Sequence, residues 1–433
     1  MIVSVFLKRP HQGLFLFLIL LFTNLSSESY NPKINTIEFT GNKKTLDYIV
    51  EREIKHPIGV SLDSTIANDD RNRIDNLGLF SQVTWKAIPL EDGSSVLTYF
   101  LTESFQRIPP IALPTYEEDT GWSLTGFWVL NNYKGRNQSL ILGGSLGGKD
   151  TYGLQFNDPW IFGNHVSMDI QFGRTLFKHL FLNKNLEVNS FNLNFGKWFG
   201  ESLKTAFSIE LEKKTFLNSI EKKSFHYLTP RVLLKYDSRD LYWNPSKGIL
   251  LSQSFKKSVG IDSKRFWLNQ WNQSYSIYHS LKSFDKKTII ALNTSFNYKW
   301  GKIEEVWLDY LGGASTVRGW RIPDSTLYYG ESQNFRFGHE LFYSSLEIRS
   351  EIIPKYITSI GVEFGLVFVL FSDIGLTALS IKELEDQLPI YGSGFGIRIP
   401  FPIVHVLRLD YGWGGRNNKW NSGALHLGVG QKF

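Results

Sequence analysis

Between Gln106 and Phe433 the chain consists of short segments in which apolar and polar residues alternate, separated by turn-forming residues. In Ile290–Trp300 the even positions are mostly apolar and the odd positions polar, and Leu203–Glu212 alternates in the same way with the parity reversed. A period of two predicts β-strands with one apolar and one polar face. In a soluble sandwich the polar face would meet water, whereas in an outer-membrane barrel the apolar face meets lipid. Alternation alone is compatible with both folds.

Three further features favour the barrel. Nearly all of the segments are about 9–13 residues long, as a tilted membrane-spanning strand requires. The chain ends on the aromatic Phe433 after the alternating Leu425, Leu427 and Val429, and we expect Phe433 to act as a C-terminal insertion signal. We count roughly sixteen segments, an even number, so residues 106–433 are predicted to form a sixteen-stranded transmembrane β-barrel. Aromatic residues at segment ends suit an interfacial girdle: Trp160, Trp198, Trp243, Trp300 and Trp413.

Residues 33–104 have a different pattern, in which strand and helix periodicities are mixed. Thr45 is expected to cap a first helix, and a second helix is expected to begin near Asp63 and stop at Gly78. The unit is predicted to be a small α+β domain with one open strand edge, which can recruit an extended peptide by β-augmentation. A spacer that binds nothing is an equally weighted alternative. Its expected strands are Ile34–Phe39, Val83–Ile88 and Ser95–Leu101.

The N-terminus is typical of a secretory signal. Lys8 and Arg9 precede the apolar run Leu14–Phe22, which is too short to span a bilayer as a helix. We therefore expect residues 1–29 to be a signal peptide, and any membrane span to be made of strands. The chain has no Cys, which excludes disulfides, thiolate metal sites and a lipid anchor on cysteine. Its formal charge of +6 is too dispersed to indicate nucleic acid as a partner.

The longest loop of this region lies between Ile289–Trp300 and Phe335–Glu351 and contains a glycine-flanked arginine, Arg318. On the strands that follow, parity places apolar rows outside and a charged row inside, where Glu347, Asp373 and Arg398 fall. An ordinary water-filled porin interior is one interpretation. The other is that the loop folds inward, because acidic wall residues would satisfy its arginine in a charge-assisted pair.

An ordered set of motifs resembles the BamA superfamily of outer-membrane assembly and translocation barrels. Val317-Arg318-Gly319-Trp320, after Gly312-Gly313, resembles its V-R-G-aromatic loop motif. The N-terminal unit is similar to one POTRA domain. The other matching segments are Phe371-Ser372-Asp373-Ile374-Gly375, Gly394-Phe395-Gly396-Ile397-Arg398, Asp237-Ser238-Arg239-Asp240 and Asn244-Pro245-Ser246-Lys247-Gly248.

The resemblance implies a barrel whose loop folds inside, with Arg318 held by Asp373 and Glu347 and with Phe371 packing nearby. It also implies that the first and last strands form a weak seam. Partners would be unfolded outer-membrane or secreted polypeptides, outer-membrane lipid, and periplasmic chaperones or accessory lipoproteins as further candidates. The location would be the outer membrane, with the N-terminal domain in the periplasm. A single POTRA-like domain departs from the several found in general assembly factors, so a more specialised export role stays open.

No motif indicates an enzyme, a cofactor or a metal. Gly143–Asp150 resembles a phosphate-binding loop, but Asp150 replaces the hydroxyl residue that would hold magnesium and no helix follows. His339-Glu340 lacks the second histidine of a zinc protease, because Tyr343 stands there. Three functions remain: insertion of other barrel proteins, export of a dedicated polypeptide, and a passive diffusion pore or structural barrel.

Overall fold

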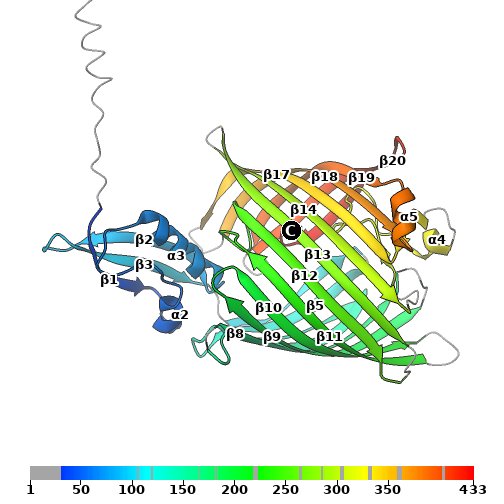
Figure 1. Cartoon of the computed structure of the whole chain (residues 1–433), viewed down its shortest axis with the longest axis horizontal. Coiled ribbons are helices and arrows are strands. Elements are labelled where there is room, and N and C mark those ends of the chain that lie inside the picture. The colour runs from blue at the N-terminus through cyan, green and yellow to red at the C-terminus, as the bar shows by residue number, and fades with distance from the viewer. Residues whose placement is uncertain are drawn as a thin grey trace, which may run out of the picture.

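The computed structural model describes residues 31–433 except 105–106, 119, 164, 181, 183, 218–222, 263–265, 284–285, 303–306, 330–333, 358–362 and 402–404. The expected signal peptide, residues 1–29, lies outside the described residues. Figure 1 shows a small N-terminal unit beside one end of a large, strongly curved sheet. None of the helices in the described ranges is long and apolar enough to cross a membrane.

The N-terminal unit is a three-stranded sheet with two helices. Its strand order is β1-β3-β2, with β1 parallel and β2 antiparallel to β3. The expected strand Ser95–Leu101 is therefore not available as an open edge, because β3 is the central strand and both its sides are paired. The edges are β1 and β2. The elements are β1 (Ile34–Thr40), α2 (Asp47–Glu51), α3 (Ser64–Asn76), β2 (Phe80–Pro89) and β3 (Ser95–Glu103).

The two helices begin in different ways. Asp63 caps α3 as expected, accepting hydrogen bonds from the backbone N–H groups of Thr65 and Ile66. Thr45, by contrast, does not cap α2, whose N-cap is Leu46 without a side-chain bond. The Thr45 hydroxyl donates instead to Glu103 (2.8 Å), at the end of β3. This contact ties the start of α2 to the sheet, and Thr45 lies one residue before the N-cap position.

The large sheet is antiparallel throughout and follows the chain in order from β4 to β22. The strand order then places β22 beside β4, and we call this pair of strands the seam. The longer strands are β4 (Arg107–Glu117), β5 (Gly121–Tyr133), β6 (Gln138–Gly147), β7 (Lys149–Asp158), β8 (Val166–Lys178), β9 (Asn185–Phe199), β10 (Leu203–Phe216), β11 (Lys223–Asp237), β12 (Gly248–Gly260), β13 (Trp267–Ser283), β14 (Lys286–Gly301), β17 (Glu340–Ile357), β18 (Glu363–Ala378), β19 (Ile390–Phe401), β20 (His405–Arg416) and β22 (Ala424–Val429).

Short elements interrupt this order at the end of the sheet that lies away from the N-terminal unit. Between β14 and β17 the chain makes the two-residue strands β15 and β16, which pair with each other. The helix α5 joins β18 to β19 (Figure 1). The short elements are β15 (Asp309–Tyr310), α4 (Ser325–Tyr329), η2 (Asn334–Arg336), β16 (Phe337–Gly338), α5 (Ile381–Asp386) and β21 (Lys419–Trp420).

Strand register fixes which side chains face the interior. Glu347 on β17 pairs with Phe371 on β18, and Phe371 pairs with Gly394 on β19. Glu347 is fully buried, whereas its sequence neighbours Leu346 and Ile348 are 41% and 40% exposed. A soluble protein would show the opposite pattern. The sheet therefore has a polar, buried inner side and an apolar outer side, as the parity of the sequence predicts.

Candidate functional site

Residues 311–320, which we call the Arg318 loop, fold into the space enclosed by the sheet. Leu311 and Val317 are completely buried and pack with Leu341 and Ile390. The loop is closed by its own hydrogen bonds, since the Gly313 N–H donates to the Trp320 carbonyl (2.7 Å). The loop is therefore a packed structural element that reaches inward from the β14–β17 connection.

Glycines allow the loop backbone to approach the strands closely. Gly319 has φ +87°, a left-handed conformation, and a side chain there would also press on the backbone of Trp413 and Gly414. On β19, a Cβ at Gly392 would overlap the carbonyl oxygen of Arg318. Gly375 leaves the space that Val317 and Leu311 fill. The sequence motifs included Gly319 and Gly375 but not Gly392.

The Arg318 guanidinium contacts three carboxylates from three strands. Its Nε and Nη2 donate to the two oxygens of Asp373 (2.8 and 2.9 Å), and its backbone N–H donates to the same group (3.0 Å). Its Nη1 donates to Glu347 (2.6 Å) and to Asp410 (3.1 Å). The Phe371 ring lies 3.6 Å from the guanidinium carbon. The structure thus brings Arg318, Asp373, Glu347 and Phe371 together, and it adds Asp410.

Further cations share these carboxylates. Arg398 donates to Asp410 (2.6 Å) and Glu347 (3.3 Å), and Arg349 donates to Glu347 (2.8 Å). Gly394 and Gly396 provide room, because a side chain at Gly394 would meet the Phe371 ring and one at Gly396 would meet Asp410. We call this set the inner-wall cluster: the carboxylates Glu347, Asp373 and Asp410 and the cations Arg318, Arg349, Arg398, Arg408 and Lys432.

The end of the chain lies in the interior and not in the last strand. β22 ends at Val429, and Gly430, with φ +77°, turns the chain away from the strand. Lys432 then donates to Thr316 of the loop (2.5 Å) and Ser345 on β17 (2.6 Å), and it pairs with Asp373 (3.0 Å). The sequence did not indicate this role for Lys432.

Phe433 consequently occupies a different place from the one that alternation indicates. Continuing the row Leu425, Leu427 and Val429 would put it on the outer side, but the turn at Gly430 breaks the alternation. Its ring lies 5.0 Å from the Arg349 guanidinium carbon and 6.3 Å from the Tyr278 ring, both of them inner-side residues. The folded structure thus holds Phe433 inside, and its role as an insertion signal stays a prediction about the unfolded chain.

A histidine and a glutamate join the loop to the seam. On β22, His426 is completely buried, and its Nε2 accepts the backbone N–H of Gly319 (2.8 Å). Its Nδ1 lies 2.6 Å from Glu118, which directly follows β4. The other oxygen of Glu118 accepts the N–H of Ala314 (2.8 Å). Neither residue was identified from the sequence, although a histidine between Leu425 and Leu427 is a polar residue at an inward position.

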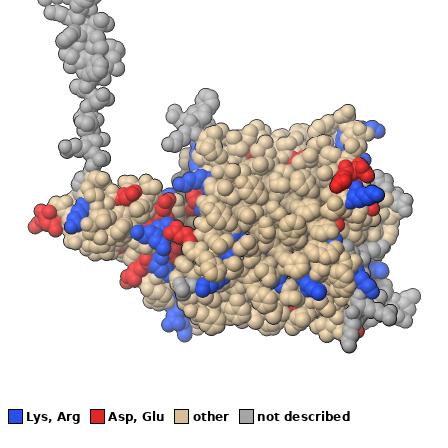
Figure 2. Space-filling view, in the orientation of Figure 1, with Lys and Arg blue, Asp and Glu red and all other residues tan. Residues whose placement is uncertain are grey.

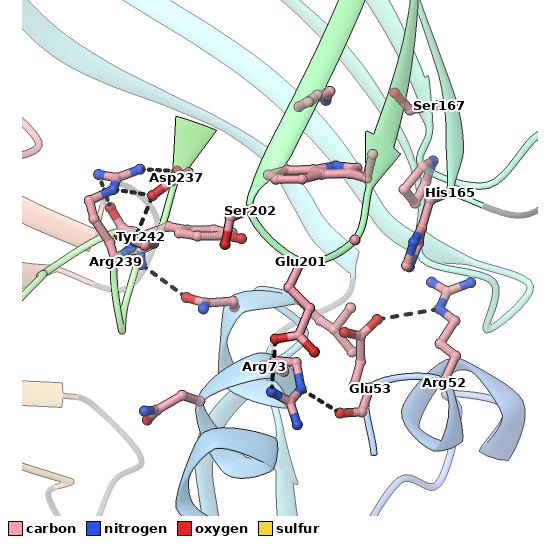
Figure 3. A pocket seen from close by; sticks show the side chains of 18 of the residues that line it. Arg52, Glu53, Arg73, His165, Ser167, Glu201, Ser202, Asp237, Arg239 and Tyr242 are labelled. Atoms are coloured by element: carbon pink, nitrogen blue, oxygen red, sulfur yellow. Dashed lines mark hydrogen bonds and ion pairs between the residues drawn. The ribbon is translucent and has the colours of Figure 1, made fainter. Parts of the chain in front are cut away.

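At the opposite end of the interior, the N-terminal unit and four turns of the sheet line a cavity of about 610 Å³ (Figure 3). Arg52, which directly follows α2, lies 4.1 Å above the Trp160 ring. The Asn76 side chain, at the end of α3, donates to the Asp240 carbonyl (3.1 Å) and accepts from the Tyr242 N–H (2.9 Å). These contacts place the N-terminal unit against the mouth of the interior.

The charged groups on the two sides of this cavity lie in different surroundings. The Asp237–Arg239 pair in the β11–β12 turn is doubly hydrogen-bonded, at 2.8 Å for each contact, so this turn satisfies its own charges. On the α2 side, burial lowers the pKa of Arg52 and of His165, and the charges of Arg52 and Lys55 lower that of His165 further. Burial also raises the pKa of Glu53. Within the described ranges, no group of three or more His, Cys, Asp or Glu side chains could hold a metal ion.

Of the remaining motif residues, Trp320 anchors the end of the loop. Its indole N–H donates to the Tyr391 carbonyl on β19 (2.8 Å). At Gly312, φ is +120° and its N–H donates to the Thr316 hydroxyl (2.9 Å), which shapes the start of the loop. The motif residues thus have two kinds of role, since Arg318 binds the wall and the others shape or anchor the loop that carries it.

Comparison with known proteins gives the same picture for both units. Residues 132–433 match the Omp85 superfamily domain, and residues 32–104 match a POTRA domain described as a surface antigen variable number repeat. Over 137 residues the chain is 26% identical to the outer membrane protein assembly factor BamA of Neisseria meningitidis serogroup B. That match covers 31% of this chain and 17% of the relative, so the chain spans only a small part of the relative's length.

Solved structures share the fold at low sequence identity. A BamA from Haemophilus ducreyi lacking POTRA domains 1–3 has a TM-score of 0.56 and 16% identity, covering 92% of this chain and 83% of that one. CdiB from Acinetobacter baumannii has a TM-score of 0.54 and 16% identity, and the match covers 93% of this chain and 74% of that one. CdiB from Escherichia coli has a TM-score of 0.54 and 12% identity, and the match covers 94% of this chain and 91% of that one. Because the superfamily domain matches residues 132–433, more than half of the chain, the chain belongs to the Omp85 superfamily.

Proposed function

We propose that this protein lies in the outer membrane and inserts β-barrel proteins into it, or passes polypeptides across it. In this proposal residues 106–433 close into a sixteen-stranded barrel, and residues 33–104 are its periplasmic domain. The observation that carries the proposal is the Arg318 loop, which the inner-wall cluster holds inside the sheet. A passive diffusion pore or structural barrel, the alternative from the sequence, has no need of such a loop or of a POTRA domain.

The distribution of side chains supports the membrane location. On the face of the large sheet seen in Figure 2, most of the surface is uncharged; charged residues lie near its two ends and at the N-terminal unit, with some basic residues along its lower part. The outward side chains between the ends are large and apolar, such as Leu370, Phe395 and Leu427, each more than 40% exposed. Such a surface would be an aggregation risk in water and is well suited to lipid.

The seam favours insertion as the first candidate activity. β22 has six residues, whereas β20, with which it pairs on its other side, has twelve. A short last strand leaves much of the edge of β4, which has eleven residues, without a long partner. Free backbone groups on a strand edge can pair with an incoming strand. A client strand could therefore be added at the seam, in contact with lipid.

Export is the second candidate, and the loop favours it. The loop occupies an interior lined by polar side chains, and its displacement would open a path for an extended chain. Depletion of the protein followed by outer-membrane proteomics separates the two activities. Loss of many barrel proteins supports insertion, and loss of one secreted product supports export. If neither changes, both candidates are wrong and the pore alternative gains support.

A further inference from the structure

We propose that Glu118 and His426 are positioning residues that couple the inward position of the Arg318 loop to closure of the seam. The inference deepens the proposed function, on which it rests, because it concerns the regulation of the same site. Glu118 follows β4 and His426 lies on β22, so the two residues come from opposite sides of the seam. We call the pair the seam latch.

The hydrogen bonds of the latch determine how the imidazole must be protonated. A backbone N–H is always a donor, so the Nε2 that receives the Gly319 N–H (2.8 Å) carries no proton. The proton of the neutral ring is then on Nδ1, which donates to Glu118 (2.6 Å). With its other oxygen Glu118 receives the Ala314 N–H (2.8 Å). Only this arrangement satisfies all three contacts together.

The latch and the inner-wall cluster both bind residues of the Arg318 loop, but they connect the loop to different strands. The Arg318 side chain reaches β17, β18 and β20 through Glu347, Asp373 and Asp410. The N–H of the next residue, Gly319, donates to His426 on β22. The Ala314 N–H donates to Glu118, which directly follows β4. The wall alone could therefore keep the arginine in place with the seam open, whereas the latch needs both seam strands in their closed positions.

Thermodynamic linkage makes the proposal testable from both sides. If loop position stabilises the closed seam, a closed seam must stabilise the loop by the same free energy. Breaking the latch should therefore loosen both the seam and the loop. Breaking the arginine contacts with the wall, as in Arg318→Ala, should loosen the seam as well, although neither latch residue has been changed.

Isosteric substitutions can separate the three contacts. In Glu118→Gln the amide can still accept from Ala314, but it then presents N–H groups to Nδ1, so either the Glu118 contact or the Gly319 contact must be lost. His426→Gln extends an acceptor to the place of Nε2 and loses the contact with Glu118. His426→Asn keeps a donor at the place of Nδ1, toward Glu118, and loses the contact with the Gly319 N–H. His279→Ala is the matched control, since His279 lies on β13 and is exposed on the outer side.

Spin-label distances in lipid nanodiscs provide the measurement, and the absence of Cys from the chain means that engineered cysteines have no background. One pair of labels, at Leu113 and Leu427, spans the seam, and a second, at Ser315 and Leu370, reports the loop. We expect a single narrow distribution for both pairs in the parent protein and in His279→Ala. In Glu118→Gln and His426→Asn the population outside that peak should rise roughly tenfold for both pairs of labels. This is the effect expected from the loss of one strong hydrogen bond.

Two outcomes would overturn the proposal. One is a seam distribution that stays narrow in Glu118→Gln and His426→Asn. The other is a seam that stays narrow in Arg318→Ala while the loop pair broadens, because the two movements are then independent. Heat-modifiable migration on gels identifies any variant that has not folded. If His426→Asn does not fold, His426→Gln replaces it, and the same rise is expected because this variant loses the contact with Glu118. Since the distances need no client, a negative proteomics result would refute the proposed function and leave the latch standing.

Discussion

The inner-wall cluster predicts an unequal response to the loss of Arg318 and of Asp373. In Arg318→Ala four side-chain hydrogen bonds disappear, but each carboxylate keeps another cation. Asp373 keeps Lys432 (3.0 Å), and Glu347 and Asp410 keep Arg398 (3.3 and 2.6 Å). Breaking a buried ion pair costs about 3–5 kcal/mol when a charge is left alone. Since none is left alone here, we expect about 3 kcal/mol, at the lower end of this range.

Asp373→Ala should cost more, although it removes the same contact. The cluster contains five cations and three carboxylates, so removing a carboxylate increases an existing excess of positive charge. Lys432 then retains the Thr316 carbonyl and the Ser345 hydroxyl, which are both uncharged partners. We expect about 5 kcal/mol for this variant. Arg318→Lys should restore the stability of Arg318→Ala only in part, because an ammonium group cannot bind Asp373 through two parallel bonds.

Equilibrium unfolding by urea in detergent micelles, followed by tryptophan fluorescence, would give these free energies at neutral pH. In a double-mutant cycle Arg318→Ala and Asp373→Ala should fall short of additivity by about 1–3 kcal/mol. The matched control is the cycle for Arg174 and Glu187, whose 2.8 Å pair joins β8 and β9 but is about a quarter exposed. That cycle should give about 0–1 kcal/mol. Additive losses at Arg318 and Asp373 would refute the pairing, and a larger loss for Arg318→Ala would refute the argument from charge excess.

Four further predictions concern other parts of the chain. The purified protein should require detergent, give a β-type circular dichroism spectrum and migrate differently on gels when heated; a protein soluble without detergent would contradict the membrane location. Photocrosslinkers along Ile34–Thr40 should capture extended clients in cells, weakly because edge pairing uses few anchoring side chains, and an absence of crosslinks would favour the spacer interpretation. Gly392→Ala should displace the loop and broaden its spin-label distances, whereas Gly173→Ala, where a Cβ meets nothing closer than 3.8 Å, should not. Lys432→Met should lower the urea midpoint, and an unchanged midpoint would show that the end of the chain does not stabilise the cluster.

Sequence parity predicted the inner wall because a strand has a strict period of two, and the apolar residues fix which side faces outward. Parity placed Asp373 and Glu347 on the inner side for this reason, and the resemblance to the BamA superfamily supplied their pairing with Arg318. The positions of Lys432 and Phe433 could not, because a single glycine in the left-handed region, Gly430, ends the alternation just before them. Parity predicts nothing for residues beyond the end of a strand.

Contacts between distant parts of the chain were also beyond the sequence. Thr45 has the chemistry of a helix cap, but its hydroxyl donates to Glu103 and receives a bond from Asn132 on β5. Glu118 and His426 are more than 300 positions apart, and only the place of β22 beside β4 in the strand order brings them together. A local pattern cannot show such pairs. Their existence follows from the strand order, and their contact partners follow from the path of the loop.

The polar character of the cluster is consistent with a loop that has to leave its place. An apolar plug of the same size would be held by the hydrophobic effect, and its removal would expose apolar surface to water. A buried ion network gives little net stability relative to well-packed apolar residues, but it requires a single geometry. If the loop left its place as the proposed function requires, water would hydrate its arginine and the wall carboxylates, and this hydration would offset much of the lost pairing. In the proposed function, the inner-wall cluster would therefore define the inward position of the loop and still permit its release.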